Sequence, residues 1–162
     1  MSTDRIEKQI LLRAPRQRVW QAISDSAQFG YWFGVDFDGP FVAGASITGR
    51  ITPSKADPEM GRMQQPYQDV RFEWLVEKVE PMDRMVFRWH PFGVDKSIDY
   101  SHEPMTRIVF ELQDAEDGVM LTVTESGFDR LPPERRAKAF AANDGGWTRQ
   151  MGAIRKYLEQ AR

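Results

Sequence analysis

The C-terminal segment, residues 131–158, constrains the fold most, because it predicts one long helix. Its start, Leu131-Pro132-Pro133-Glu134, combines proline at the first helical position with an acidic residue in the first turn. A helix with one apolar stripe must bury it against another part of the protein. The apolar residues recur at the spacing of one such stripe: Phe140, Trp147, Met151, Ile154 and Leu158.

Two glycines interrupt this helical pattern. Asn143-Asp144-Gly145-Gly146 lies inside it, and each glycine costs about 1 kcal/mol relative to alanine in a helix interior. The backbone at Gly145 and Gly146 could approach another element more closely than a β-carbon allows. Alternatively, Asn143 and Asp144 could cap a new helix and divide the segment in two.

Upstream of this helix, apolar residues mostly alternate with polar ones, which predicts β-strands. Short turns join several of these segments, which indicates an antiparallel sheet. Two short helices are expected after the first strand, at 15–24 and 27–33. Residues 52–69 and 91–105 are interpreted as long polar loops, either functional lids or simply mobile. The expected strands cover residues 6–12, 35–37, 45–51, 70–79, 84–90, 106–112 and 119–125.

The order of elements is a strand, two helices, about six strands and one long helix. This order predicts an α+β fold in which a curved antiparallel sheet covers its apolar face with the terminal helix. No other expected element is long enough for that task. At 162 residues, the chain is expected to form a single domain over 1–162.

Charge and composition exclude several classes of function. The formal net charge of −2 argues against nucleic acid as a partner. No apolar run is long enough for membrane insertion, and the polar N-terminus carries no secretory signal. We therefore expect a cytoplasmic protein. A basic cluster near the start of the terminal helix is interpreted as a solvated face: Arg130, Arg135, Arg136 and Lys138.

The ligands for a metal site are scarce. The chain has no cysteine and only two histidines, His90 and His102, and neither belongs to a metal-binding motif. No nucleophile elbow or glycine-rich phosphate loop occurs. We therefore predict no metal, no cofactor and no catalytic residue that a motif identifies.

Aromatic side chains are abundant, with five tryptophans and ten phenylalanines. Such side chains form cores, and they also line pockets for apolar ligands. Trp74 and Trp89 are predicted on the concave face of neighbouring strands. If the helix packs on the sheet, Trp32, Phe33, Trp147 and Met151 converge on the same region. Packed core and open cavity share this geometry and differ only in unfilled volume.

Glu125 is the one carboxylate predicted to face this region. Counting by two from Val119, Leu121 and Val123 places it on the inward face of the last strand. A carboxyl group against an apolar cavity would have a raised pKa and could act as a polar anchor or general base. Alternatively, the strand frays before Gly127, or Glu125 pairs with Arg88 or Arg130 at the rim.

Several segments together resemble a known family. The run ILLRAPRQRVWQAI, Ile10 to Ile23, resembles the opening of START-like (SRPBCC) helix-grip domains. GVMLTVTESGF, the later NDGGW and the loop DKSIDYSHEPMTRIVFEL are similar to one branch of that superfamily. This branch is named after the C-terminal domain of the activator of the heat-shock chaperone ATPase (AHSA-like). The resemblance extends from about Ile6 to Leu158.

The resemblance implies a sheet of six to seven strands wrapped around one C-terminal helix, with a cavity between them. Relatives carry small residues before the tryptophan that Trp147 matches. We therefore expect a continuous or gently kinked helix with Trp147 facing inward, and a loss of stability in Gly145→Leu and Gly146→Leu. The predicted ligand-binding residues are Trp32, Phe33, Trp74, Phe87, Trp89, Phe110, Leu121, Glu125, Trp147 and Met151.

Binding of a hydrophobic small molecule such as a lipid or polyketide, without enzymatic activity, is the leading functional hypothesis. A chaperone or stress-response role is the first alternative. It follows from the resemblance alone, and because the activators carry a further N-terminal domain we expect no stimulation of the chaperone ATPase. The second alternative is a cyclase or hydrolase that uses Glu125 as acid or base, with His90 or Tyr67 nearby.

Overall fold

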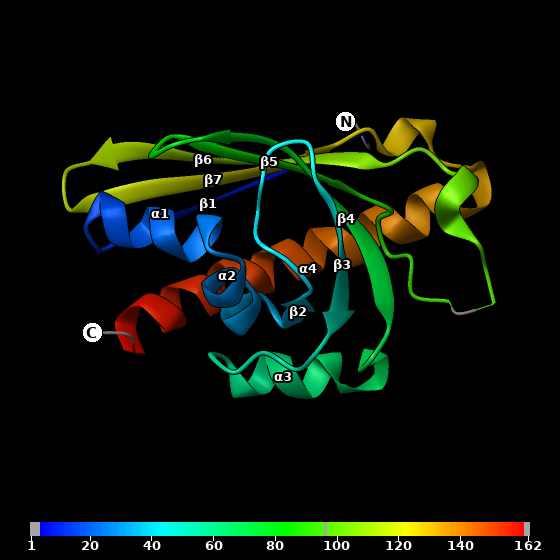
Figure 1. Ribbon diagram of the computed structural model, residues 1–162, viewed down its shortest axis with the longest axis horizontal. Coiled ribbons are helices and arrows are strands. Elements are labelled where there is room, and N and C mark those ends of the chain that lie inside the picture. The colour runs from blue at the N-terminus through cyan, green and yellow to red at the C-terminus, as the bar shows by residue number, and fades with distance from the viewer. Residues whose placement is uncertain (1–3, 96, 161–162) are drawn as a thin grey trace.

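The computed structural model describes residues 4–95 and 97–160 of the chain. Residues 1–3, 96 and 161–162 of the predicted domain lie outside the described residues. Within them, seven strands and four α-helices follow the predicted α+β order (Figure 1). Their bounds are β1 (Arg5–Leu12), α1 (Arg16–Ser24), α2 (Ser26–Phe33), β2 (Val35–Phe37), β3 (Ser46–Ile51), α3 (Pro58–Gln64), β4 (Arg71–Glu80), β5 (Arg84–Trp89), β6 (Thr106–Ala115), β7 (Gly118–Ser126) and α4 (Pro133–Gln160).

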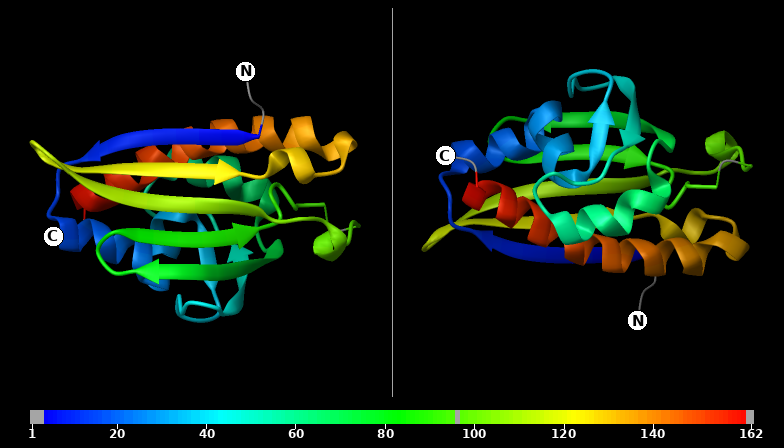
Figure 2. Two further views of the ribbon diagram at one scale, coloured as in Figure 1. Left: turned by 90° about the horizontal axis from the view of Figure 1, so that it is seen from above. Right: turned by 90° about the horizontal axis from the view of Figure 1, so that it is seen from below.

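The seven strands form one sheet in the order β1-β7-β6-β5-β4-β3-β2, and every neighbouring pair is antiparallel. Consecutive strands are neighbours from β2 to β7, and β1 closes the far edge beside β7 (Figure 2). A register shift between Val76 and Lys78 in β4 adds local bending to the sheet. The predicted curved antiparallel sheet is confirmed.

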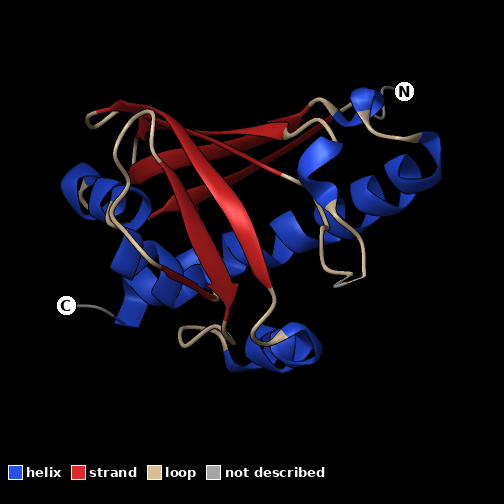
Figure 3. Ribbon diagram, turned by 45° about the vertical axis from the view of Figure 1, so that its right-hand side comes forward, coloured by secondary structure: helices blue, strands red, loops and turns tan. Residues whose placement is uncertain are grey.

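Helix α4 runs across the concave face of the sheet as one continuous element (Figure 3). Trp147, Met151 and Ile154 are buried on it, which confirms the predicted inward face. The alternative of two separate helices divided at Asn143 is wrong. None of the helices among the described residues is long and apolar enough to cross a membrane.

The two short helices after β1 are also confirmed. Helix α2 begins where a carboxylate oxygen of Asp25 accepts a hydrogen bond from the backbone N–H of Ala27, at 3.0 Å. It ends at Gly34, whose φ of 89° favours glycine. Both helices lie at one end of the sheet, beside the C-terminal half of α4 (Figure 1). They close that end of the core.

The prediction of a loop over 52–69 is wrong in part, because this segment contains α3 and a 3₁₀ turn at Gln65–Tyr67. Asp57 caps α3 by accepting a hydrogen bond from the N–H of Met60 at 3.2 Å, and Pro58 follows it directly. These are ordinary helix-start signals. Most of α3 is exposed, so it has no apolar stripe that periodicity could detect. Among residues 91–95 and 97–105, which the structure describes, the predicted loop contains a short 3₁₀ turn at Tyr100–His102 and no other helix or strand.

The explanation of the two glycines by close backbone approach is wrong. A β-carbon at Gly146 would meet no atom within 4 Å outside the neighbouring helix backbone. At Gly145 it would lie 3.3 Å from Nη1 of Arg149, the far end of a flexible side chain. The expected loss of stability in Gly145→Leu and Gly146→Leu therefore lacks its steric basis. Gly146 instead borders a small pocket of about 70 Å³.

Aromatic rings fill the space between the sheet and the helices. Phe29, fully buried on α2, contacts rings from five other elements or loops. Trp74 on β4 packs against Phe87 on β5, with ring centroids 4.7 Å apart. Ring pairs of this kind add about 0.5–1.5 kcal/mol beyond the burial of their area. The core is therefore dense around Phe29, and a cavity lies between α3 and the middle of α4.

Candidate functional site

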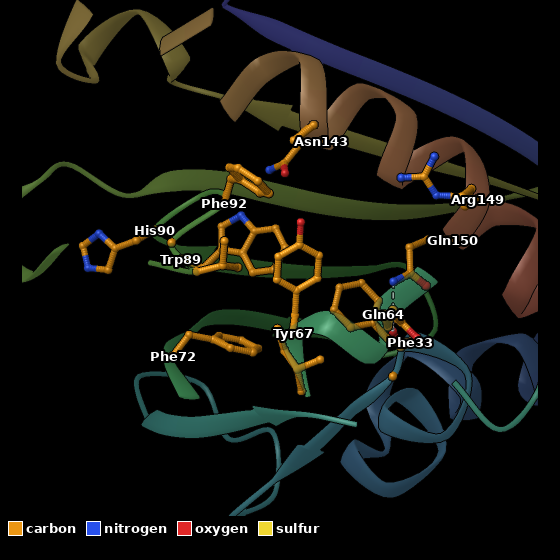
Figure 4. A pocket seen from close by; sticks show the side chains of 15 residues that line it. Phe33, Gln64, Tyr67, Phe72, Trp89, His90, Phe92, Asn143, Arg149 and Gln150 are labelled. Atoms are coloured by element: carbon orange, nitrogen blue, oxygen red, sulfur yellow. Dashed lines mark hydrogen bonds between the residues drawn. The ribbon is translucent and has the colours of Figure 1, made fainter. Parts of the chain in front are cut away.

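A cavity of about 370 Å³ lies between α4, the open end of the sheet and α3. Its walls come from the end of α2, strands β3 to β5, the α3 region, the loop after β5 and the middle of α4. Figure 4 shows the side chains of the residues that line it. The apolar side chains include Phe33, Phe72, Trp89 and Phe92, and the polar ones are Gln64, Tyr67, His90, Asn143, Arg149 and Gln150.

Three of the ten predicted binding residues border open space. Phe33 and Trp89 line the main cavity. A smaller space of about 70 Å³ adjoins it, bordered by Phe33, Trp89 and Trp147 together with Asn143, Gly146 and Gln150. The rings of Phe33, Trp89 and Trp147 contact one another, with centroids 5.9–6.2 Å apart. Sequence periodicity predicted that these three rings converge, and they are in contact; their role in ligand binding stays a prediction.

Six other predicted residues lie deeper and pack against each other rather than around space. Among the described residues, none of these six borders either cavity. Their fold position was predicted correctly, while a role in ligand contact stays a prediction. They are all buried: Trp32, Trp74, Phe87, Phe110, Leu121 and Met151.

Glu125, the tenth predicted residue, is completely buried at the end of β7, as its inward position required. The strand continues to Ser126 and does not fray. Arg88 does not pair with Glu125, because its Nε donates to Glu77 Oε1 at 2.5 Å. Pairing of Glu125 at the rim is therefore wrong as an alternative, since its oxygens are occupied inside the core.

Four neutral donors surround the Glu125 carboxylate. Oε1 accepts hydrogen bonds from Nε1 of Trp147 at 2.7 Å and from Nδ2 of Asn143 at 2.9 Å. Oε2 accepts from Nε1 of Trp89 at 2.7 Å and from Oγ1 of Thr106 at 2.5 Å. Burial raises the pKa of the Glu125 carboxyl, and the four hydrogen bonds oppose that rise. The carboxylate thus orients two cavity-wall indoles and one amide.

Glu125 itself is not among the described residues that line either cavity. Its hydrogen-bond partners Trp89, Trp147 and Asn143 stand between its oxygens and the open space. A general base must reach the proton that it removes, directly or through one water. The geometry therefore favours a structural role, in which Glu125 positions the side chains of Trp89, Trp147 and Asn143 through hydrogen bonds.

His90 borders the main cavity and is chemically distinct from its neighbours. Its Nδ1 is buried and has no hydrogen-bond partner. Burial lowers the pKa of the His90 imidazole, which favours the neutral ring. Its Nε2 lies 3.9 Å from Oε1 of Glu73, which is too long for a hydrogen bond. Figure 4 shows the His90 ring directed away from the rings of Phe33, Tyr67 and Trp89.

Two glutamines at the cavity were missed by the sequence interpretation. Gln64 Nε2 and Gln150 Nε2 both donate to the carbonyl oxygen of Phe33, each at 2.9 Å. Oε1 of Gln64 accepts from the N–H of Ser54 at 2.8 Å, whereas Oε1 of Gln150 is buried without a partner. Gln150 lies three residues after Trp147, so helical spacing alone could have placed it on the inward face.

Arg135 was also missed, and its interpretation as part of a solvated face is wrong. Its guanidinium donates to both oxygens of Glu103, at 2.8–3.2 Å, and to the carbonyl oxygens of Pro91 and Phe92. It also lies over the ring of Tyr100, 4.7 Å from the ring centroid. These contacts hold Phe92, a cavity residue with a φ of 50°, in a backbone conformation that bulky residues rarely adopt.

The described residues contain no group of three or more acidic or histidine side chains that could hold a metal ion. The polar groups at the cavity are instead amides, a phenol, an imidazole and one guanidinium. Such groups orient organic molecules through hydrogen bonds.

Comparison with solved structures shows the same fold in several proteins. MLL2253 from Mesorhizobium loti matches with a TM-score of 0.71 at 16% identity, covering 98% of each chain. The Aha1 dimer from Colwellia psychrerythraea matches with a TM-score of 0.67 at 17% identity, again with 98% coverage of each. DynU16, from the dynemicin biosynthetic locus, is 26% identical with a TM-score of 0.68. That match covers 98% of the present chain, which spans about half (48%) of DynU16.

A comparison with curated protein sequences finds no significant match. The sequence profile of one family, described as activator of Hsp90 ATPase homolog 1-like protein, matches residues 13–159. This range includes every element from α1 to α3, all strands after β1, and α4 nearly to its end. With the helix-grip fold and a profile match over most of its length, the chain belongs to the activator of Hsp90 ATPase homolog 1-like family.

Proposed function

We propose that the protein binds a hydrophobic small molecule in the cavity between α4, α3 and the sheet. The observation that carries this proposal is the cavity of about 370 Å³, with aromatic walls and a few polar side chains at its border. Small-molecule sites typically measure 300–1,000 Å³ and combine apolar walls with a few placed polar groups. A dry core would instead be packed without such space.

Binding without catalysis fits the chemistry of the cavity better than an enzymatic function. The buried carboxylate, Glu125, is covered by its own hydrogen-bond donors, and His90 has no carboxylate within hydrogen-bond distance to orient it. A cyclase or hydrolase mechanism through Glu125 would require those donors to move aside.

A thermal-shift screen against fatty acids, sterols, flavonoids and polyketides tests this proposal. A ligand at one hundred times its Kd stabilises the folded state by about 2.7 kcal/mol. Ala142→Trp should abolish the shift, because Ala142 borders the cavity. Ala141→Trp is the matched control, since this neighbour is exposed on the same helix. Absence of a shift with every compound would contradict the proposal.

Chaperone association is a second candidate, because the family description names an activator of a chaperone ATPase. The measurement is the ATPase rate of the purified chaperone with and without the protein. We predict an unchanged rate. A clear, saturable increase would favour this candidate, and retention of the increase in Ala142→Trp would show that it does not depend on the cavity.

A further inference from the structure

We infer that the cavity binds a hydrophobic monocarboxylate, whose carboxylate group is held by the guanidinium of Arg149 at the exposed border of the cavity while its apolar body lies among the aromatic rings. This inference rests on the proposed function and deepens it by naming the class of ligand. Three observations carry it: the charges of the cavity lining, the surroundings of Arg149 on α4, and the exposure of this residue beside buried rings.

The lining of the main cavity carries one cationic side chain and, among the described residues, no acidic one. Arg149 is that cation. Burial lowers the pKa of His90, which favours its neutral ring, and this ring is directed away from the aromatic walls (Figure 4). The buried Glu125 is covered by its own hydrogen-bond donors. A ligand that enters the cavity therefore meets a positive charge at the border, which favours an anion over a cation.

Arg149 has no acidic partner among the described residues. The nearest side-chain neighbours on a helix are three and four residues away. The acidic residue closest in the sequence, Asp144, does not compensate this charge, because its Oδ1 lies 3.0 Å from Nζ of Lys8 on β1. The guanidinium is thus available to a bound anion. The four helical neighbours of Arg149 are all glycine or alanine: Gly145, Gly146, Gly152 and Ala153.

These small residues also leave room beside the guanidinium. Nη1 of Arg149 lies 3.3 Å from the position that a β-carbon at Gly145 would occupy, so the side chain lies back along α4 over this glycine. Figure 4 shows the guanidinium directed along α4 toward Asn143, another lining residue. A β-carbon at Gly146 or Gly152 would meet nothing within 4 Å. No bulky side chain therefore blocks the approach of an oxyanion on this flank of the helix.

The exposure of Arg149 suits an amphipathic molecule. Transfer of an ionised carboxylate into an apolar interior is costly unless the charge is paired and hydrogen-bonded. Arg149 is exposed, whereas Phe33 is buried and Trp89 is partly buried in the walls. A carboxylate at Arg149 keeps part of its hydration, while the apolar part of the same molecule is buried against the rings. The planar guanidinium can donate two parallel hydrogen bonds to one carboxylate.

Isothermal titration calorimetry with two ligands of matched shape tests the inference: 2-naphthoate and 2-naphthamide. They differ in charge at the group that Arg149 would bind. At low ionic strength we expect the wild type to bind the naphthoate about tenfold more tightly, a factor between those of fully exposed and buried charged pairs. The ratio should fall as the salt concentration rises toward about 1 M, where the screening length is only about 3 Å.

Two charge variants of α4 locate the effect. Arg149→Met should make the two ligands bind equally, since it removes the guanidinium and keeps a long apolar side chain. Arg155→Met is the matched control, because it removes the same charge from an exposed position of the same helix that borders neither cavity. The naphthoate preference should remain in this control.

A third variant tests whether both ligands bind inside the cavity. Ala142 and Arg149 are seven residues apart, two helical turns on the same side of α4, and both border the main cavity. Ala142→Trp should therefore abolish binding of the naphthoate and of the naphthamide. The exposed neighbour variant Ala141→Trp should leave both affinities unchanged.

The outcomes separate the inference from the function beneath it. Equal binding of the naphthoate and the naphthamide by the wild type would overturn the inference and leave the proposed function intact. A naphthoate preference that survives in Arg149→Met would also overturn it, because another group would then bind the carboxylate. Binding of both ligands that persists unchanged in Ala142→Trp would contradict the inference and the proposed function together, and so would absence of binding by both compounds, in each case for this ligand class.

Discussion

Glu125 is a fully buried acid whose partners are neutral donors, so its charge state must affect stability. Because the pKa of the folded state is raised above the ordinary value of 4.5, the folded protein holds the proton over a range where the unfolded chain has lost it. The free energy of unfolding is therefore highest below the unfolded pKa. It falls as the pH rises through the folded pKa, by at most about 1.4 kcal/mol per pH unit for one group.

We predict that the stability of the wild type falls relative to Glu125→Gln as the pH rises from about 4.5. Urea unfolding of both proteins at a series of pH values measures this difference, and subtraction removes the contribution of all other titrating groups. A difference that stays constant with pH, or that changes in the opposite direction, would contradict a raised pKa for this carboxyl.

Alanine substitutions at Gly146 and Gly152 allow stability and ligand binding to be compared at two glycines of the same helix. Both lie inside α4, and a β-carbon at either would meet nothing within 4 Å. We predict that Gly146→Ala and Gly152→Ala each raise the free energy of unfolding by about 0.8–1.0 kcal/mol. Of the two, only Gly146 borders the smaller space beside the main cavity, so only Gly146→Ala should also weaken ligand binding. Scanning calorimetry and titration with a compound from the thermal screen measure the two effects.

A loss of stability in Gly146→Ala would instead indicate that glycine is needed at this position because the backbone packs closely there. Equal effects of both variants on binding would show that the ligand does not lie over Gly146.

Sequence alone predicted which way Glu125 and Trp147 point, because strand and helix periods determine the side of an element on which a residue lies. It could not predict that Gln150 has a free acceptor. That property depends on the carbonyl oxygen of Phe33, which comes from a helix far away in the chain. It could not separate lining from packed aromatics either, because Trp74 and Trp89 share the same periodic pattern while only Trp89 borders open space.

At the scale of elements, Arg135 ties the start of α4 to the loop after β5. We predict that Arg135→Lys lowers the free energy of unfolding by about 1.5–3 kcal/mol, because lysine keeps the charge but loses the forked hydrogen bonds. Hydrogen exchange should quicken in residues 91–95 and 97–103, which this guanidinium holds. Lys138→Met, an exposed change on the same helix, should alter stability by less than about 0.5 kcal/mol.

Unchanged exchange in these loop residues would mean that the contacts of Arg135 contribute nothing measurable. The misinterpretation of Arg135 from sequence has a simple cause. Four basic residues near a helix start are usually solvated, and the partner Glu103 lies in a loop whose path no periodic pattern describes. Helix α3 was missed for a related reason, since an exposed helix has no apolar period.

At the scale of the whole molecule, some strands of the sheet pair with a neighbour in the sequence, and others pair with a strand far away in the sequence. Strands β6 and β7 form a hairpin in which Leu112 faces Leu121. Strand β1 completes the sheet only when Leu12 pairs with Val119, far later in the chain. Distant pairings require a larger loss of chain entropy before they form. We therefore expect β1 to join the sheet after the rate-limiting step of folding.

The corresponding prediction concerns folding kinetics. Leu12→Ala and Leu121→Ala each remove a fully buried side chain and should cost about 2–5 kcal/mol. Leu12→Ala should mainly accelerate unfolding, whereas Leu121→Ala should mainly slow folding. Stopped-flow chevron plots separate the two. Slowed folding in Leu12→Ala to the same extent would place β1 in the folding nucleus.

The antiparallel sheet and its covering helix were predictable because short turns and alternating strands leave few ways to bury one long amphipathic helix. The size of the cavity was not. It depends on how rings from α2, β4, β5 and α4 tilt against one another, which no one-dimensional pattern contains.

The tryptophan cluster also gives the protein a built-in optical reporter. The indoles of Trp74, Trp89 and Trp147 lie in series, with centroids 5.4 and 6.2 Å apart, close enough for their excited states to couple. Trp89 borders the cavity, and its N–H shares the Glu125 carboxylate with that of Trp147. Intrinsic emission and near-ultraviolet circular dichroism should therefore register both the arrival of a ligand and the protonation of Glu125, without any added label.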